Sequence, residues 1–274
     1  MGHRERLTHY LYLLGNSMKV FIADIDIEGA KRLAQELNKH GEKVWPLEVN
    51  VADWDSQRKG FEAALDRLDS KHVDYVCPIA GVGEGRTFPN RPNSVGFQEP
   101  DLTKFEVNMN GFLYTVSLAL QQFRRQEPNK HGFRGKVIAA GSVAGFYNHP
   151  GIPMCAAAKH AAVGFVRSFG KLLLDEDKIT MNIICPNKIR TNINTTGAFD
   201  KVEAAGVQLI PMSEYLAAVK NLLGSNDVSG ACFEIAPRIG YFIRQPTEFI
   251  NSDSRISGEM TLELALPLHR PIYD

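Results

Sequence analysis

The feature that most constrains the fold is an alternation of short apolar runs with amphipathic segments from residue 19 onward. Runs such as 19–24 and 135–142 are rich in β-forming residues, and the segments between them repeat their apolar residues every three or four positions. Strands that are apolar on both faces and separated by helices form a parallel sheet covered on both sides. We therefore predict an α/β fold with a doubly wound, Rossmann-like parallel sheet.

The predicted elements extend over nearly the whole chain. Strands are expected at 19–24, 43–49, 73–81, 135–142, 178–186 and 230–236, and helices at 7–14, 27–37, 61–68, 101–123, 153–174 and 211–224. The segments 82–100, 141–153 and 186–210 are expected to be irregular. Each follows a strand, so all three should line the rim at the carboxyl ends of the strands, where ligands bind in such sheets.

The length of 274 residues suits one domain. We predict a single Rossmann-like domain over 1–274, in which the Pro-containing segment 237–274 is a tail that wraps the domain or contacts a second subunit. No internal repeat or low-complexity tract is visible.

Charge and cysteine content narrow the possible partners and location. The 31 basic and 31 acidic residues leave no net charge to attract nucleic acid or an anionic membrane, so a small molecule or a second copy is the expected partner. No apolar segment is long enough to cross a bilayer, and the basic start lacks a signal-peptide cleavage site. The four cysteines are far apart without metal-ligand spacing. We expect reduced thiols, no metal and a cytoplasmic protein.

Several short motifs occur in a recognisable order. An acidic residue ends the strand at 19–24, and the sequences IAG, VNMNG, GSVAG, a Lys-His pair and ICPNKIRT follow at 79–81, 107–111, 141–145, 159–160 and 184–191. This order resembles the short-chain dehydrogenase/reductase family from about residue 4 to about residue 244. The resemblance implies hydride transfer between a nicotinamide cofactor and a small, fairly apolar alcohol or ketone.

The resemblance also implies four catalytic positions. In this family a serine holds the substrate oxygen, a tyrosine exchanges its proton, a lysine supports the tyrosine and binds ribose, and an asparagine supports a proton relay. The matching residues are Ser142, Cys155, Lys159 and Asn108. Only the tyrosine position departs from the pattern.

Cys155 has two interpretations. It lies one helical turn before Lys159, and a nearby lysine at a helix N-terminus can stabilise a thiolate that acts as a nucleophile or base. The alternative, which we favour, is a small buried residue in place of a lost tyrosine. A thiol lies one bond beyond Cβ, so it falls short of a carbonyl that needs an approach of about 2.6 to 3.2 Å.

The other three positions also have structural alternatives. Ser142 either contacts the substrate, which we favour, or only caps a turn. Asn108 either supports a relay or is a helix-kink residue beside Gly111, and neither interpretation is preferred. Lys159 on an apolar helix face is costly without a partner, so a present or former functional role is favoured.

The family's glycine-rich phosphate turn should precede the ribose-binding acid Asp24 by about 20 residues. Counting back from Asp24 reaches the first residues, so we expect the first strand and this loop to be missing. Either the strand at 19–23 pairs directly with the strand at 73–81, or the sequence has lost its true start. Dinucleotide binding is then expected to be weak or lost.

The remaining cofactor contacts follow from the resemblance. An acidic residue at position 24 favours a free ribose diol, hence NAD over NADP, although Asp24 also suits an N-cap for the helix near Ile27. Pro78 and Ile79 replace two amides of the family motif. The expected cofactor-binding residues are Asp24, Asn50, Val51, Ala80, Gly81, Lys159, Ile189 and Thr191.

Three functions remain open, in narrow order of preference. The first is an NAD(P)-linked oxidoreductase, with the proton supplied by Cys155, water or another group. The second is a cofactor-independent isomerase, cyclase or dehydratase on the same scaffold. The third is a catalytically silent partner of a related enzyme. A homo-oligomer, dimer or tetramer, is expected through the helices that carry 107–116 and 159–174.

Overall fold

The computed structural model describes residues 18–89, 95–191 and 193–270. The helix predicted at 7–14 lies outside these residues. The chain divides into two compact units, Met1–Arg244 and Gln245–Asp274, and the first contains all the strands.

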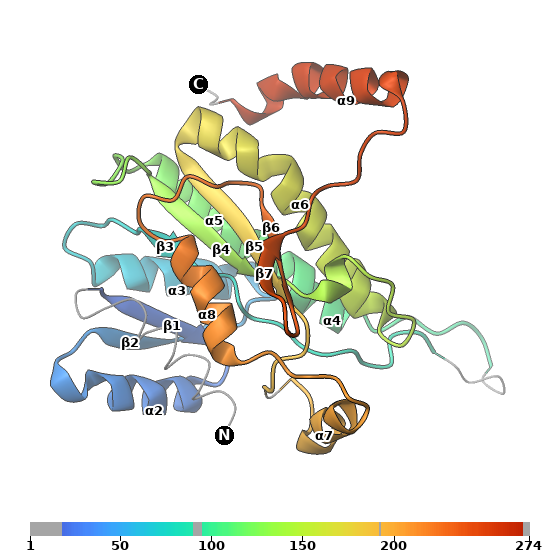
Figure 1. Ribbon diagram of the computed structural model, residues 1–274. Helices are drawn as coiled ribbons and strands as arrows, with labels where there is room; N and C mark the ends of the chain where they lie inside the picture. The colour runs from blue at the N-terminus through green and yellow to red at the C-terminus, as the bar shows by residue number, and fades with distance from the viewer. Residues whose placement is uncertain (1–17, 90–94, 192, 271–274) are drawn as a thin grey trace. The chain divides into compact units, whose positions relative to one another are not determined.

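The order of elements confirms the predicted alternation (Figure 1). In chain order they are β1 (Val20–Asp24), α2 (Ile27–Leu37), η1 (Asn38–His40), β2 (Val44–Glu48), α3 (Trp54–Asp66), β3 (Tyr75–Val76), α4 (Thr103–Phe105), η2 (Glu106–Asn110), α5 (Gly111–Arg124), β4 (Gly135–Ala140), η3 (Val143–Gly145), α6 (Pro153–Asp177), β5 (Ile179–Pro186), α7 (Thr196–Ala204), α8 (Met212–Asn221), β6 (Cys232–Ala236), β7 (Gly240–Ile243), α9 (Ser252–Ala265) and η4 (Leu266–His269).

The strands form two sheets. β1 pairs in parallel with β2, while β3, β4, β5 and β6 form a second parallel sheet with β7 added antiparallel at its edge. No ladder among the described residues joins β1 to β3. The predicted alternative of direct pairing between 19–23 and 73–81 is therefore wrong.

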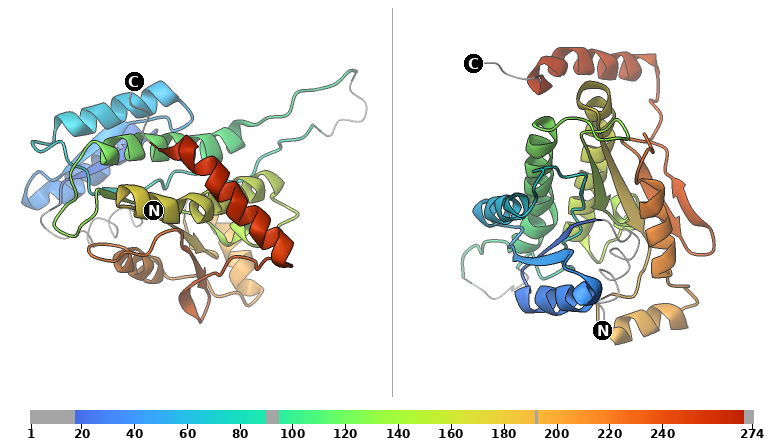
Figure 2. Two further views of the ribbon diagram at one scale, coloured as in Figure 1. Left: turned by 90° about the horizontal axis from the view of Figure 1, so that it is seen from above. Right: turned by 90° about the vertical axis from the view of Figure 1, so that its left-hand side faces the viewer.

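Helices cover both faces of the larger sheet, as a parallel sheet requires. α5 and α6 pack on one face through a core that includes Phe123, Val166 and Ile183, and α8 packs on the other through a core that includes Ile184, Val219 and Ile235. Figure 2 shows α5 and α8 on opposite sides of this sheet. Each such side chain, fully buried, stabilises the fold by about 1.5 to 3 kcal/mol before conformational entropy is subtracted.

The helix predicted at 101–123 is interrupted. η2 is a π-helical turn, and α5 begins at Gly111, where an added Cβ would lie 3.0 Å from the Val51 carbonyl oxygen. Gln57 donates from Nε2 to the Val51 and Gly111 carbonyls at 2.6 and 2.9 Å. The glycine thus allows the loop after β2 to contact the start of α5.

The prediction of an irregular segment at 186–210 is wrong in part. The segment 186–210 contains α7, whose Phe199 is buried. The segment 237–274 contributes β7, which pairs with β6, before it continues into the second unit with α9. Neither element has the regular apolar periodicity on which the sequence analysis relied.

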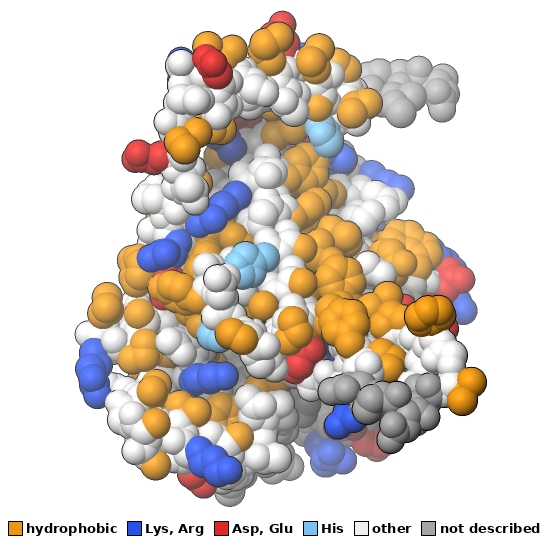
Figure 3. All heavy atoms as spheres, turned by 90° about the vertical axis from the view of Figure 1, so that its right-hand side faces the viewer, with side chains coloured by type: hydrophobic (Ala, Val, Ile, Leu, Met, Phe, Trp, Pro, Cys, Tyr) orange, Lys and Arg blue, Asp and Glu red, His pale blue; other side chains and the backbone are white. Residues whose placement is uncertain are grey.

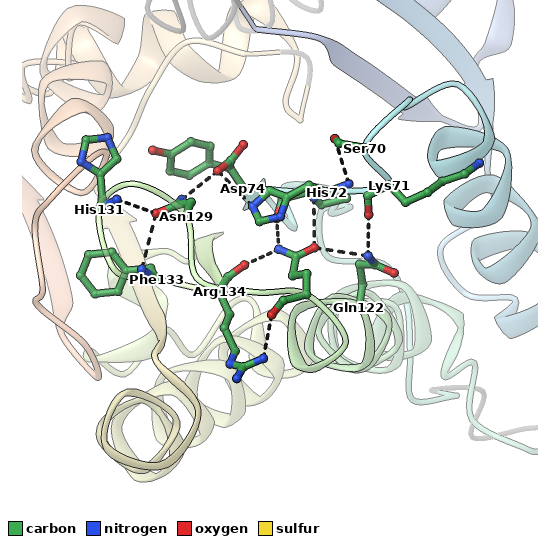
Figure 4. Close-up of polar contacts among 12 residues, drawn as sticks. Ser70, Lys71, His72, Asp74, Gln122, Asn129, His131, Phe133 and Arg134 are labelled. Carbon is green, nitrogen blue, oxygen red and sulfur yellow. Dashed lines mark hydrogen bonds and ion pairs between the residues drawn. The ribbon is translucent and has the colours of Figure 1, made fainter.

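Polar side chains connect the helices to the amino ends of the strands (Figure 4). Gln126 accepts a hydrogen bond from Val73 N–H and donates to the carbonyls of Val73 and Arg134, while Gln122 donates to the Lys71 carbonyl at 2.8 Å. Asn129 donates to the Asp74 carboxylate at 2.8 Å. These side chains satisfy backbone groups that the short strand β3 leaves unpaired.

On the face shown in Figure 3, acidic and basic side chains are scattered among hydrophobic ones. Within residues 18–89, 95–191 and 193–270, none of the helices is both long enough and apolar enough to cross a bilayer.

Candidate active site

The carboxyl end of β4 positions Ser142 and Lys159. Ser142 begins η3, and its hydroxyl accepts a hydrogen bond from Ala144 N–H at 3.1 Å. Lys159 approaches from α6 and donates from Nζ to the Ala140 carbonyl at 2.9 Å. A Cβ added at Gly145 would lie 2.7 Å from the Lys159 carbonyl oxygen, so a glycine is needed for η3 to approach α6 this closely.

Lys159 retains capacity to bind a ligand. An ammonium group has three N–H donors, and one of them is used by the Ala140 carbonyl. Although the residue as a whole is only partly buried, its ammonium group lies deep enough for burial to lower the pKa of Lys159. The remaining donors suit ribose hydroxyls or a substrate oxygen.

Asn108 lies in the π-helical turn and is buried. Its amide oxygen accepts from Val82 N–H at 2.8 Å and its amide nitrogen donates to the Val82 carbonyl at 2.9 Å. The same nitrogen lies 3.9 Å from Cys155 Sγ. Asn108 is therefore both the residue at the helix kink and the anchor of the loop after β3.

Cys155 lies in the first turn of α6 beneath this loop. Its Sγ is 3.7 Å from the Val82 carbonyl oxygen, and its backbone N–H donates to Glu84 Oε2 at 2.8 Å. Burial and then the charge of Glu84 raise the pKa of Cys155 to about 11, against the opposing effect of Lys159. The thiol is thus protonated at neutral pH, which supports the interpretation of a small structural residue rather than a reactive thiolate.

The cofactor residues predicted on the β1–β2 side occupy the carboxyl ends of those strands. Asp24 accepts a hydrogen bond from Asp26 N–H through Oδ1 at 2.9 Å, leaving Oδ2 without a partner in the described part of the chain. The N-cap of α2 is Asp26, whose side chain accepts from Gly29 N–H, so the alternative role of Asp24 as that cap is wrong. Asn50 is exposed and accepts from Ala52 N–H at 3.1 Å.

The other predicted cofactor residues lie nearer the catalytic positions. Ala80 and Gly81 follow β3, and a Cβ added at Gly81 would lie 3.2 Å from Asn108 Oδ1. Ile189 packs against the core beneath α8, and Thr191 follows in the same loop after β5. Gly81 therefore lies next to Asn108, one of the predicted catalytic residues. Asp24 ends β1 and Asn50 follows β2, so both are at the smaller sheet.

A dinucleotide fits this donor set in part. The free Asp24 oxygen suits a ribose diol, the spare Lys159 donors suit the second ribose, and Gly81 leaves room for close approach. The position where the family's glycine-rich turn would fall lies outside the described residues.

The structure also contains a polar cluster that the sequence analysis missed. The Tyr147 phenol donates to both oxygens of Glu234 at 2.9 and 3.1 Å, and Arg244 Nε lies 3.4 Å from the same buried carboxylate. These bonds raise the pKa of Tyr147. The acidic residue inside the apolar run 231–236 was the available signal. Because its phenol is committed to Glu234, Tyr147 is poorly suited to replace a tyrosine at 155.

Comparison with known proteins agrees with this arrangement. The family model described as short chain dehydrogenase matches residues 10–200. A short-chain dehydrogenase/reductase, prx7, of Penicillium rubens is 28% identical over 193 residues, covering 68% of this chain and 65% of that protein. The chain thus spans slightly less than two thirds of that relative.

Two further matches extend the comparison. A cis-2,3-dihydrobiphenyl-2,3-diol dehydrogenase of Pseudomonas putida is 26% identical over 205 residues, covering 73% of this chain and 67% of that enzyme. A 3-ketoacyl-(acyl-carrier-protein) reductase from Brucella melitensis, solved with NADH, has the same fold, with a TM-score of 0.67 at 19% identity over 85% of this chain and 92% of that one. The family model covers most of the chain and the fold agrees. The protein is a member of the short-chain dehydrogenase/reductase family.

Proposed function

We propose that this protein is an oxidoreductase that transfers a hydride between a nicotinamide cofactor and a small, fairly apolar alcohol or ketone. The observation that carries the proposal is the placement of Asn108, Cys155 and Lys159 around the carboxyl ends of β3 and β4, with Ser142 at the start of η3. In such sheets, ligands bind beyond these strand ends.

NAD is the proposed cofactor in preference to NADP. Asp24 would hold the adenosine ribose through its free oxygen, with Asn50 and Val51 beside the adenine. Lys159 would hold the second ribose, Ala80 and Gly81 would lie beneath it, and Ile189 and Thr191 would face the nicotinamide amide. When bound, the nicotinamide supplies the acceptor or donor of the hydride.

The chain's own residues have defined tasks in this proposal. Ser142 presents its hydroxyl to the substrate oxygen, and the η3 turn keeps that hydroxyl at a fixed position. Lys159 stabilises negative charge that develops on that oxygen, an effect that increases where water is excluded. Asn108 fixes the loop after β3 above α6 and thereby shapes the wall of the site.

Titration with NAD and NADH, followed by the fluorescence of Trp45 and Trp54, tests the cofactor. We expect saturable binding, weaker binding of NADP, and a loss of this preference in D24N. The amide of D24N keeps an acceptor for Asp26 N–H, so the turn between β1 and α2 keeps its hydrogen bond. Absence of saturable binding by the wild type would contradict the proposal.

A cofactor-independent isomerase, cyclase or dehydratase is the second candidate. The lack of pairing between β1 and β3 among the described residues favours it, because the dinucleotide would lie across that boundary. The position of the family's phosphate turn outside the described residues leaves the same half of the site undefined. Product formed without any nicotinamide would support this function, and strict dependence on NAD would exclude it.

A catalytically silent partner is the third candidate. Altered activity of a related enzyme in a mixed oligomer with an inactive form of this chain would support it. We also infer that the protein is a cytoplasmic homo-oligomer that contacts its copies through α5 and α6. Size-exclusion chromatography with light scattering tests the oligomeric state.

A further inference from the structure

The loop after β3 holds a carboxylate against the catalytic position 155. Glu84 Oε2 accepts from Cys155 N–H at 2.8 Å, and both backbone groups of Val82 are bound by Asn108. A Cβ added at Gly83 would lie 3.4 Å from the Ile193 carbonyl oxygen. A Cβ added at Gly85 would lie 3.2 Å from Lys104 Cε, so the loop is closely packed on both sides of Glu84.

Few groups near position 155 can accept a proton. The charged side chains that act on the Cys155 thiol are Glu84, Lys159 and Lys104. A lysine ammonium group donates hydrogen bonds and has no acceptor, and the thiol itself is protonated and too short to reach a substrate. Tyr147 binds Glu234 instead. Among the described charged side chains that act on the thiol, Glu84 is the one that can accept a proton.

We propose that Glu84 replaces the missing phenol as the proton acceptor in alcohol oxidation and as the proton donor in the reverse reaction. This rests on the proposed function. The alcohol O–H bond breaks and its proton goes to the Glu84 carboxylate. The C–H hydrogen leaves with its electron pair as hydride to the oxidised nicotinamide, so the alcohol is oxidised to a ketone and the nicotinamide is reduced. Glu84 then releases its proton to solvent.

The surroundings favour a carboxylate in this role. The N-terminus of α6 stabilises negative charge through its free N–H groups, of which Cys155 N–H is one. Carboxylic acids are also several pKa units stronger than phenols. An enzyme that uses a carboxylate should therefore oxidise alcohols at lower pH than one that uses a phenolate.

E84Q is the decisive variant, because its amide oxygen still accepts from Cys155 N–H. We expect kcat for oxidation to fall about 100-fold or more with KM within about threefold, and the acidic limb of the kcat pH profile to disappear. E99Q alters an exposed glutamate of the same long loop and should leave kcat unchanged. An E84Q variant with kcat within about threefold of wild type would overturn the proposed role of Glu84 without contradicting the proposed function.

A second readout does not depend on turnover. Glu84 raises the pKa of the Cys155 thiol, so E84Q should shift the pH dependence of Cys155 alkylation, followed by peptide mass spectrometry, to lower pH. An unchanged alkylation profile would place the carboxylate away from position 155 and overturn the proposal. A wild type that binds no NAD and oxidises no alcohol would instead overturn the proposed function, whatever the alkylation profile.

Discussion

A lysine ammonium group lies near each end of strand β4, that of Lys136 from the strand itself and that of Lys159 from α6, and the two differ in their surroundings. Lys136, at the amino end, donates from Nζ to the Asn226 carbonyl and lies 3.8 Å from the Phe133 ring centroid. Lys159, at the carboxyl end, donates to the Ala140 carbonyl. Burial lowers the pKa of both side chains, that of Lys136 to about 8.

The two lysines differ in whether they and their neighbours keep hydrogen-bond donors for a ligand. At the amino end, an aromatic ring covers the Lys136 ammonium, and the nearby amides are already bonded, as Figure 4 shows for Gln122 with the Lys71 carbonyl and for Asn129 with the Asp74 carboxylate. At the carboxyl end, Lys159 keeps donors for a ligand and Ser142 keeps its hydroxyl proton. A buried lysine therefore indicates chemistry only where its neighbours leave it free to bind.

The largest expected effect separates the two lysines by activity. In the proposed mechanism Lys159 faces the reacting oxygen, so K159M should lower kcat/KM for alcohol oxidation about 1000-fold, equivalent to about 4 kcal/mol of transition-state stabilisation. K136M should retain kcat/KM within about threefold. Steady-state kinetics of both purified variants provides the measurement. Equal losses in the two variants would remove the distinction between the two ends of β4.

Substitutions of Gly135 and Gly141, at the two ends of β4, should distinguish an effect on stability from an effect on activity. A Cβ at Gly135 would lie 2.3 Å from the Phe123 ring, and one at Gly141 would lie 2.4 Å from Cys185 Sγ. Because both glycines face tightly packed parts of the same core, G135A and G141A should each lower the free energy of unfolding by about 1 to 3 kcal/mol. Only G141A, which displaces the strand next to Ser142, should also lower kcat.

Chemical denaturation and kinetics at a temperature where both variants are folded distinguish these outcomes. A G141A variant with full activity, or a G135A variant that loses activity while folded, would contradict the assignment of the site to the carboxyl end.

The sequence predicts the layered fold because hydrophobic periodicity follows burial. The strands of the larger sheet have buried residues on both faces, as in Ile179–Pro186, and α5 and α6 carry apolar stripes. α7, β7 and α9 were missed because their packing is local or leaves much apolar surface exposed, as for Ile243 in β7 and Leu264 in α9. A segment whose apolar side chains are only partly buried shows no clear hydrophobic periodicity in its sequence.

The site is predicted less completely, for a physical reason. Motif order predicts roles for Ser142, Lys159 and Asn108, which lie in or next to regular elements. The contact of Glu84 with Cys155 depends on the path of an irregular loop, which periodicity does not describe. The cap of α2 was considered as an alternative role for Asp24, whereas Asp26 supplies it, because acidic residues at both positions suit a helix start.

The pH dependence of stability tests the burial of Lys136. Folding lowers the pKa of this base from 10.5 to about 8, so the unfolded chain binds its proton more tightly in that range. Stability of the wild type relative to K136M should therefore rise between about pH 8 and pH 10, by about 1 to 3 kcal/mol, and stay constant below pH 8. Urea unfolding of both proteins across this range gives the difference, and a difference independent of pH would contradict the burial of a charged ammonium.

The smallest expected effect concerns Cys155. The thiol makes only long contacts, 3.7 Å to the Val82 carbonyl oxygen and 3.9 Å to Asn108 Nδ2, and neither is a strong hydrogen bond. C155A should therefore lower the free energy of unfolding by about 1 kcal/mol or less and leave kcat within about threefold of wild type. Kinetics and urea unfolding measure both quantities. A loss of activity comparable to that of K159M would make the thiol a catalytic group. An active C155A would show that the proton acceptor at this end of the sheet comes from outside the position where the family has its tyrosine.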